Sequence, residues 1–179
     1  MKKIISIILL VTFAFSACEK DDICDPDTPT TPRLIIEFYD INNPDNTRTV
    51  TNLKVIGEGM TEGVIFNESA TGESKYLTNA SSIAIPLKTN EDICTYHFIL
   101  NSGNSNTAIV NEDVITFNYS RKDEYVSRAC GFKTVYQLNS SIPFVQTDGT
   151  NADSFWMQIV EVEQSNIENE NEAHFKVFF

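Results

Sequence analysis

Four cysteines are the residues best able to carry covalent chemistry in this chain: Cys18, Cys24, Cys94 and Cys130. Cys18 follows Ser16 and Ala17, two small residues at the end of an apolar run. Small residues directly before a cysteine are what a lipoprotein signal peptidase accepts. The spacing therefore predicts that Cys18 receives diacylglycerol on its sulfur and becomes the mature N-terminus. The alternative is an ordinary signal peptide cut near Ala17, which leaves Cys18 as a reactive thiol.

Residues 1–17 have the layout of a secretory signal peptide. Lys2 and Lys3 form a short basic region, and residues 4–15 form an apolar region. That apolar region is shorter than the ~20 residues that cross a bilayer, so we expect cleavage and export rather than a permanent membrane helix. With the Ser-Ala-Cys that follows, it resembles a bacterial lipobox. It departs from one at Phe15, where most lipoboxes carry Leu, Val or Ile.

Residues 18–32 are predicted to be a tether that begins at the lipidated cysteine. After Cys18 this segment holds five acidic residues and three prolines. The acidic residues extend the chain by repelling one another, the prolines stiffen it, and little is left to pack in a core. Glu19, Asp21 and Asp22 look like the surface-export signal of Bacteroidetes lipoproteins. An ordinary solvated linker is the alternative interpretation.

The three remaining cysteines are an odd number for an exported protein, so at most two of them pair. Cys94 shares a strand face with Tyr96 and Phe98 because side chains alternate with period 2, and this apolar face predicts a buried thiol. Cys24 and Cys130 both lie near the ends of predicted elements. Our hypothesis is a Cys24–Cys130 disulfide that pins the tether to the domain, and a Cys94–Cys130 bridge is the alternative.

The chain after Pro32 reads as a succession of short strands, and no window has a helical period. Polar clusters such as residues 42–46 predict turns, and residues 121–124 predict a charged connection. The pattern is typical of an all-β fold, an immunoglobulin-like β-sandwich or a related Greek-key barrel of about 8–9 strands, with residues 33–179 as a single domain. The predicted strands cover residues 33–39, 49–56, 64–66, 81–87, 93–100, 114–119, 132–138, 155–162 and 173–179.

Two segments carry a resemblance to a known family. Residues 31–39 and residues 125–132, which follow Cys18 and Cys24, look like a family of small Bacteroidetes lipoproteins of unknown function. The likeness runs along most of the mature chain. It implies a lipoprotein and the pairing of Cys24 with Cys130, and it implies no activity.

The other candidate sites have simpler structural interpretations. His97 and His174 are predicted to face solvent on their strands, and Trp156, the one strong stacking residue for a glycan, is predicted to lie in the core. The Asp148–Asp153 loop is rich in oxygen ligands for calcium but does not fit the EF-hand register. Glu168, Glu170 and Glu172 are predicted to form a solvated loop tip. We therefore expect no metal and no cofactor.

Charge and motifs narrow the function classes. The net charge is −12; without Lys2 and Lys3 the mature chain has 11 basic and 25 acidic residues, or −14, which argues against nucleic acid. No nucleophile, triad or P-loop motif is present, so we expect no enzyme.

The leading expectation is a lipid-anchored protein of the cell envelope, in the outer membrane on its periplasmic face or at the cell surface. It would act as a protein-interaction module with a membrane β-barrel or another envelope protein. The alternative is a surface lipoprotein that binds glycan or calcium.

Overall fold

The computed structural model describes residues 23–28, 30–151 and 153–179. Within these ranges the chain forms twelve strands and two short 3-10 segments, η2 (Gly72–Tyr76) and η3 (Thr107–Ile109), so the all-β prediction is confirmed. The strands are β1 (Leu34–Asp40), β2 (Asn43–Thr47), β3 (Leu53–Gly57), β4 (Leu77–Thr78), β5 (Ser82–Ile85), β6 (Ile93–Leu100), β7 (Asn111–Ser127), β8 (Gly131–Leu138), β9 (Phe144–Asp148), β10 (Ile159–Val162), β11 (Asn166–Ile167) and β12 (Phe175–Phe178).

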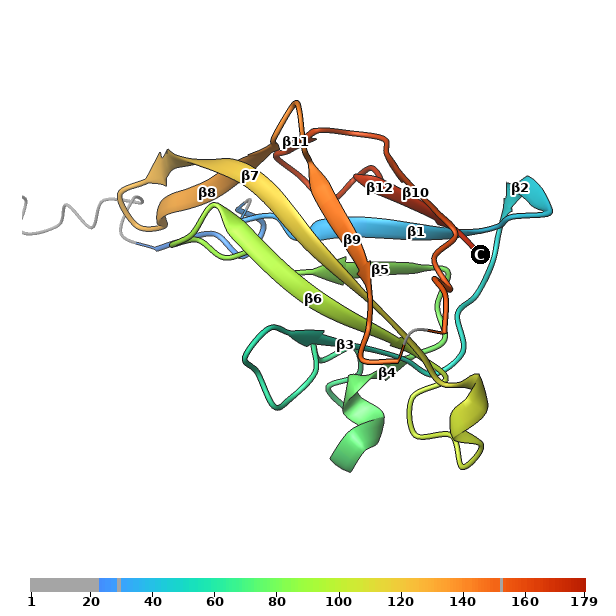
Figure 1. Ribbon diagram of the computed structural model, residues 1–179. Helices are drawn as coiled ribbons and strands as arrows, with labels where there is room; N and C mark the ends of the chain where they lie inside the picture. The colour runs from blue at the N-terminus through green and yellow to red at the C-terminus, as the bar shows by residue number, and fades with distance from the viewer. Residues whose placement is uncertain (1–22, 29, 152) are drawn as a thin grey trace, which may run out of the picture.

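The strands form two open sheets in a sandwich-like arrangement. The first sheet has the order β10-β12-β1-β2, with β5 also paired to β1, and its β1 and β12 run parallel. The second has the order β11-β8-β7-β6-β3-β4, with β9 also paired to β7. Figure 1 shows β7 and β8 reaching past the rest of the fold toward the N-terminal segment, while the C-terminus lies at the other end.

The core lies between the sheets and follows the predicted alternation. Leu34, Ile36 and Phe38 point inward from β1, and Ile115 and Phe117 point inward from β7, all of them fully buried. Phe117 meets Phe175 of the facing sheet in an edge-to-face contact with ring centroids 5.2 Å apart. Such contacts stabilise a core beyond the area they bury.

The long strand β7 overturns one prediction. Residues 121–124 were expected to be a charged connection, but they continue the strand, and Arg121 pairs in register with Tyr136 of β8. The first half of β7 pairs with β6 and β9, and its second half pairs with β8. Charged side chains are tolerated there because this half of the hairpin extends past the core, where Lys122 reaches solvent beside Glu124.

Three other expectations differ from the structure. Residues 42–46 were expected to form a turn, but residues 43–47 form β2, because they pair with the end of β1 across a register shift. Residues 64–66 form no strand, and only an isolated Ile56–Gly63 bridge marks that stretch. The expected central strand at 155–162 is shortened to β10, which lies at the edge of its sheet. Trp156 is buried, as predicted, and donates from its indole nitrogen to the Phe98 carbonyl.

Candidate functional site

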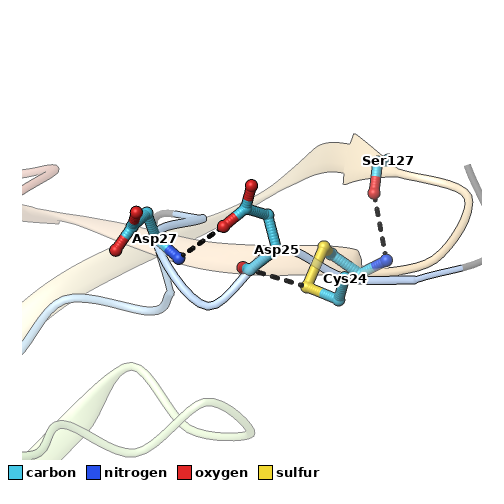
Figure 2. Close-up of a disulfide and its surroundings, with 5 residues drawn as sticks. Cys24, Asp25, Asp27 and Ser127 are labelled. Atoms are coloured by element: carbon cyan, nitrogen blue, oxygen red, sulfur yellow. Dashed lines mark hydrogen bonds between the residues drawn. A yellow bond between two sulfur atoms is a disulfide. The ribbon is translucent and has the colours of Figure 1, made fainter. Parts of the chain in front are cut away.

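The disulfide between Cys24 and Cys130 joins the N-terminal segment to the tip of the β7–β8 hairpin. Its sulfur atoms are 2.00 Å apart and its Cα atoms 4.9 Å apart. Figure 2 shows the bridge beside Ser127, whose hydroxyl oxygen accepts a hydrogen bond of 3.0 Å from the Cys130 amide. Cys94 is free and buried, and burial raises the pKa of its thiol. The predicted pairing is therefore the one found, while Cys18 lies outside the described residues.

Two further contacts hold the same segment against the fold. The Thr134 amide of β8 donates a 2.9 Å hydrogen bond to the Thr31 hydroxyl oxygen. The Arg33 guanidinium donates to both carboxylate oxygens of Glu170, at 2.9 and 2.6 Å, and this hydrogen bonding lowers the pKa of Glu170. Glu170 was expected to be part of a solvated tip, and here it fixes the start of β1 instead.

An exposed aromatic pair lies close to the disulfide. Tyr125 and Phe132 face each other across β7 and β8 in an edge-to-face contact with centroids 5.4 Å apart. Tyr125 is 63% exposed and Phe132 is 68% exposed. Phe132 shares a face of β8 with Tyr136 and Leu138, which are buried, yet Phe132 itself lies on the part of the hairpin that projects past the rest of the fold (Figure 1).

The hairpin tip and the N-terminal segment enclose an open hollow of about 300 Å³. Cys24 and Thr28 line it from the segment, and Val126 and Phe132 line it from the hairpin. Ile23, next to the disulfide, is also strongly exposed. We call Ile23, Tyr125 and Phe132 the hairpin-tip patch. Exposed apolar side chains grouped on a monomer indicate a contact surface.

His97 is held between two carboxylates rather than facing solvent alone. Its Nδ1 lies 2.7 Å from Glu112 Oε1, and its Nε2 lies 2.7 Å from Glu58 Oε2. Two ionised carboxylates at both ring nitrogens call for a doubly protonated ring. Burial on its own lowers the pKa of His97, but the hydrogen bonds to both glutamates outweigh it and raise that pKa.

The His97→Gln substitution tests this arrangement. Because the folded pKa of His97 is raised, its stabilisation is fully present below the ordinary value of 6.5 and is lost as pH rises through the folded pKa. We expect the variant to lose about 1 kcal/mol of unfolding free energy at pH 6, and the difference from wild type to shrink toward pH 9. Urea titrations across this range measure it. Glu58→Gln, which leaves Glu112 in place, should show a smaller pH slope, and a pH-independent loss for His97→Gln contradicts the charged ring.

His174 was predicted to face solvent and is instead almost fully buried. Its Nδ1 accepts a 2.9 Å hydrogen bond from the Ile35 amide, and its own amide donates to the Ile35 carbonyl. Burial lowers the pKa of His174, so the ring is held neutral. The residue lies just before β12 and continues the pairing with β1 through its side chain.

A buried carboxylate was missed by the sequence analysis. Asp113 of β7 is fully buried, and its Oδ2 accepts hydrogen bonds from the Met157 amide at 2.8 Å and from Gln146 Nε2 at 3.2 Å. Its Oδ1 has no partner among the described residues. The sequence did contain a sign of this burial. Asp113 lies two and four positions before Ile115 and Phe117, so all three side chains lie on the same face of the strand, and that face points into the core.

The oxygen-rich loop after β9 is organised by its own backbone. Asp148 Oδ1 accepts from the Gly149 amide and Oδ2 from the Ser154 amide, at 3.0 and 3.1 Å. Glu112 accepts from the Thr150 hydroxyl at 2.7 Å.

In the part of the chain that the structure describes, no three His, Cys, Asp or Glu side chains gather in a way that could hold a metal ion. None of the described helical segments is long and apolar enough to cross a membrane.

These features define a class of protein: a two-sheet, all-β domain with its N-terminal segment covalently tied to a projecting hairpin. Residues 52–179 match the model of a family of unknown function (DUF6452), and the chain belongs to this family. The matched part includes Cys130 but not Cys24 or β1. No curated protein and no solved structure matches the chain. The expected resemblance is thus confirmed as far as a family of unknown function, and the lipoprotein part stays a prediction.

Proposed function

We propose that this chain is a lipid-anchored protein of the cell envelope, with residues 1–17 removed and Cys18 acylated. The observation that supports it most is the Cys24–Cys130 disulfide. Disulfides persist in oxidising compartments outside the cytosol, which agrees with the export signal at the N-terminus. The bridge also lies only six positions after Cys18, so it ties the membrane-proximal end of the tether to the folded domain. The proposed location is the outer membrane, on its periplasmic face or at the cell surface.

The anchored domain acts, in this proposal, through protein contacts and without catalytic chemistry. Two edge strands support this role, because β9 and β10 present half-exposed apolar side chains at Val145, Ile159 and Val162. Natural sheets usually cover or charge such edges unless they have a partner. A membrane β-barrel or another envelope protein is the partner class. The strong negative charge argues against nucleic acid as a partner and against adsorption to anionic lipid through a basic surface.

The lipid anchor is tested by the mass of the mature N-terminal peptide. Full-length protein expressed in a host with lipoprotein processing should begin at Cys18 and carry the added mass of diacylglycerol. The matched variant is Cys18→Ser with residues 1–17 replaced by a conventional secretory signal peptide, because a lipoprotein signal peptidase does not cleave before serine and the uncleaved apolar region would itself hold the chain in the membrane. This variant should keep its fold and leave the membrane fraction. A mature protein that begins at an unmodified Cys18, or a Cys18→Ser variant of this kind that stays with membranes, contradicts the anchor.

The protein contact is tested by affinity capture from detergent-solubilised native membranes. We expect a stoichiometric envelope protein to accompany the lipidated chain. The Cys18→Ser domain, added to the same extract, should capture the same protein, because the contact is made by the fold and not by a shared micelle. Capture with the lipidated chain alone, or no reproducible partner, contradicts an interaction module and directs attention to glycan and calcium screens.

A further inference from the structure

We propose that the tip of the β7–β8 hairpin docks on the lipid surface, with the hairpin-tip patch seated among the lipid headgroups. This inference rests on the lipid anchor proposed above and adds an orientation of the domain on the membrane. It concerns Tyr125 and Phe132, two large aromatic side chains that the fold leaves uncovered.

Chain length places the tip next to the membrane. Cys24 follows Cys18 by six positions, which an extended chain covers in at most about 20 Å. Because the disulfide joins Cys24 to Cys130, that limit applies to the hairpin tip and not only to the tether. Without the bridge the anchor would reach the domain through the longer Pro-rich segment that precedes β1. The bridge therefore brings this one end of the fold to the lipid.

The side chains at the tip suit a headgroup layer. Tyrosine and tryptophan concentrate at membrane interfaces because they combine an apolar ring with a polar group. Tyr125 is such a residue, Phe132 packs against it as an apolar ring, and Ile23 adds an exposed aliphatic side chain beside the disulfide. Together these three provide an apolar surface at the point where the anchor holds the domain.

The charges around the tip are mixed. Residues 125–134 contain Arg128 and Lys133 and no acidic residue, but Glu124 lies 3.7 Å from Lys133, and Asp25 and Asp27 follow Cys24 on the N-terminal segment. The proposed docking therefore depends on the apolar side chains of the tip and not on attraction between basic residues and phosphate groups. The opposite end of β7 begins at Asn111, 16 or more residues from the tip, which corresponds to about 50 Å of extended strand. That end should stay in water.

Depth-dependent fluorescence quenching tests the orientation. The full-length, lipidated protein is reconstituted in phosphatidylcholine vesicles whose acyl chains carry bromine close to the headgroups. One variant is Phe132→Trp. The matched control is Ile109→Trp, an exposed position just before β7 at its other end. Buried Trp156 gives the same background in both. We expect brominated lipid to reduce the added emission at position 132 at least two-fold and to leave it unchanged at position 109.

The possible outcomes distinguish a failure of lipid docking from a failure of the lipid anchor. Equal emission with and without bromine at position 132, in protein whose Cys18 carries the diacylglycerol mass, overturns the docking and leaves the anchor intact. A mature chain without that mass overturns both. Two other outcomes overturn lipid docking. A blue shift of the emission at position 132 in solution at high protein concentration assigns the patch to a second copy of the chain. A blue shift seen only when native membrane proteins are present assigns it to a protein partner. Tyr125→Trp repeats the measurement if Phe132→Trp melts below wild type.

Discussion

Replacing both Cys24 and Cys130 with serine is expected to lower the free energy of unfolding by about 4–5 kcal/mol, the largest effect of any change considered for this chain. The bridge closes a loop with a sequence separation of 106, and the entropy that a cross-link removes from the unfolded chain grows with loop length. The loop contains β1 to β7, so nearly half of the strand pairing is formed inside it. Urea unfolding of the oxidised wild type and the double variant measures the difference.

The expected effect arises mostly in the unfolded state. In the folded variant the N-terminal segment still has the Thr31–Thr134 hydrogen bond and the Arg33–Glu170 ion pair, so the native fold should change little. The unfolded variant is less constrained, and its m-value should therefore rise. Wild type treated with reductant should unfold at the same urea concentration as the double variant, and reductant should not change the unfolding of the double variant.

Cys94→Ala supplies the matched control. This variant loses a buried thiol, and its unfolding should remain as sensitive to reductant as that of wild type, because the bridge is intact. A double variant that unfolds at the same urea concentration as oxidised wild type contradicts the chain-entropy account. It also removes the reason to regard the tether as part of the folded domain.

Strand faces could be predicted from the sequence because alternation is a local property. It placed Cys94 on a buried strand face with Tyr96 and Phe98, as the structure has them. It could not show that Phe132 is exposed, because alternation tells which face a residue lies on and not how far the opposite sheet extends. The extent of a sheet depends on where β1 and β12 end, which is a property of pairing between distant segments.

The predictions for polar residues also failed where the outcome depends on pairing between distant segments. His174 was assigned to the solvent face by parity, yet it lies before β12 begins, where its ring bonds the backbone of β1. The residues 121–124 were assigned to a connection by their charge, yet they pair with β8 because the hairpin continues past the core. For the candidate site, the cysteine pair was within reach of the sequence, while the exposure of Tyr125 and Phe132 was not.

Asp113→Asn is expected to raise the free energy of unfolding at pH 7 by about 1–3 kcal/mol. Burial, opposed in part by hydrogen bonds from Met157 and Gln146 and aided by the nearby Asp148, raises the pKa of Asp113 from 3.8 to about 6. An increase of this size corresponds to about 3 kcal/mol of penalty for the charged form. An asparagine can keep the acceptor that the Met157 amide needs and carries no charge to bury.

The pH dependence gives this prediction its sharpest form. The folded state holds the Asp113 proton more tightly than the unfolded state, so its contribution is most favourable below pH 3.8 and is lost as pH rises through about 6. The advantage of Asp113→Asn over wild type should therefore be absent near pH 4 and fully developed at pH 7 in urea titrations. Asp45→Asn, on the exposed strand β2, removes the same charge without burial and should change stability little at either pH. If Asp113→Asn is instead less stable than wild type at pH 7, the ionised carboxylate is required by the fold.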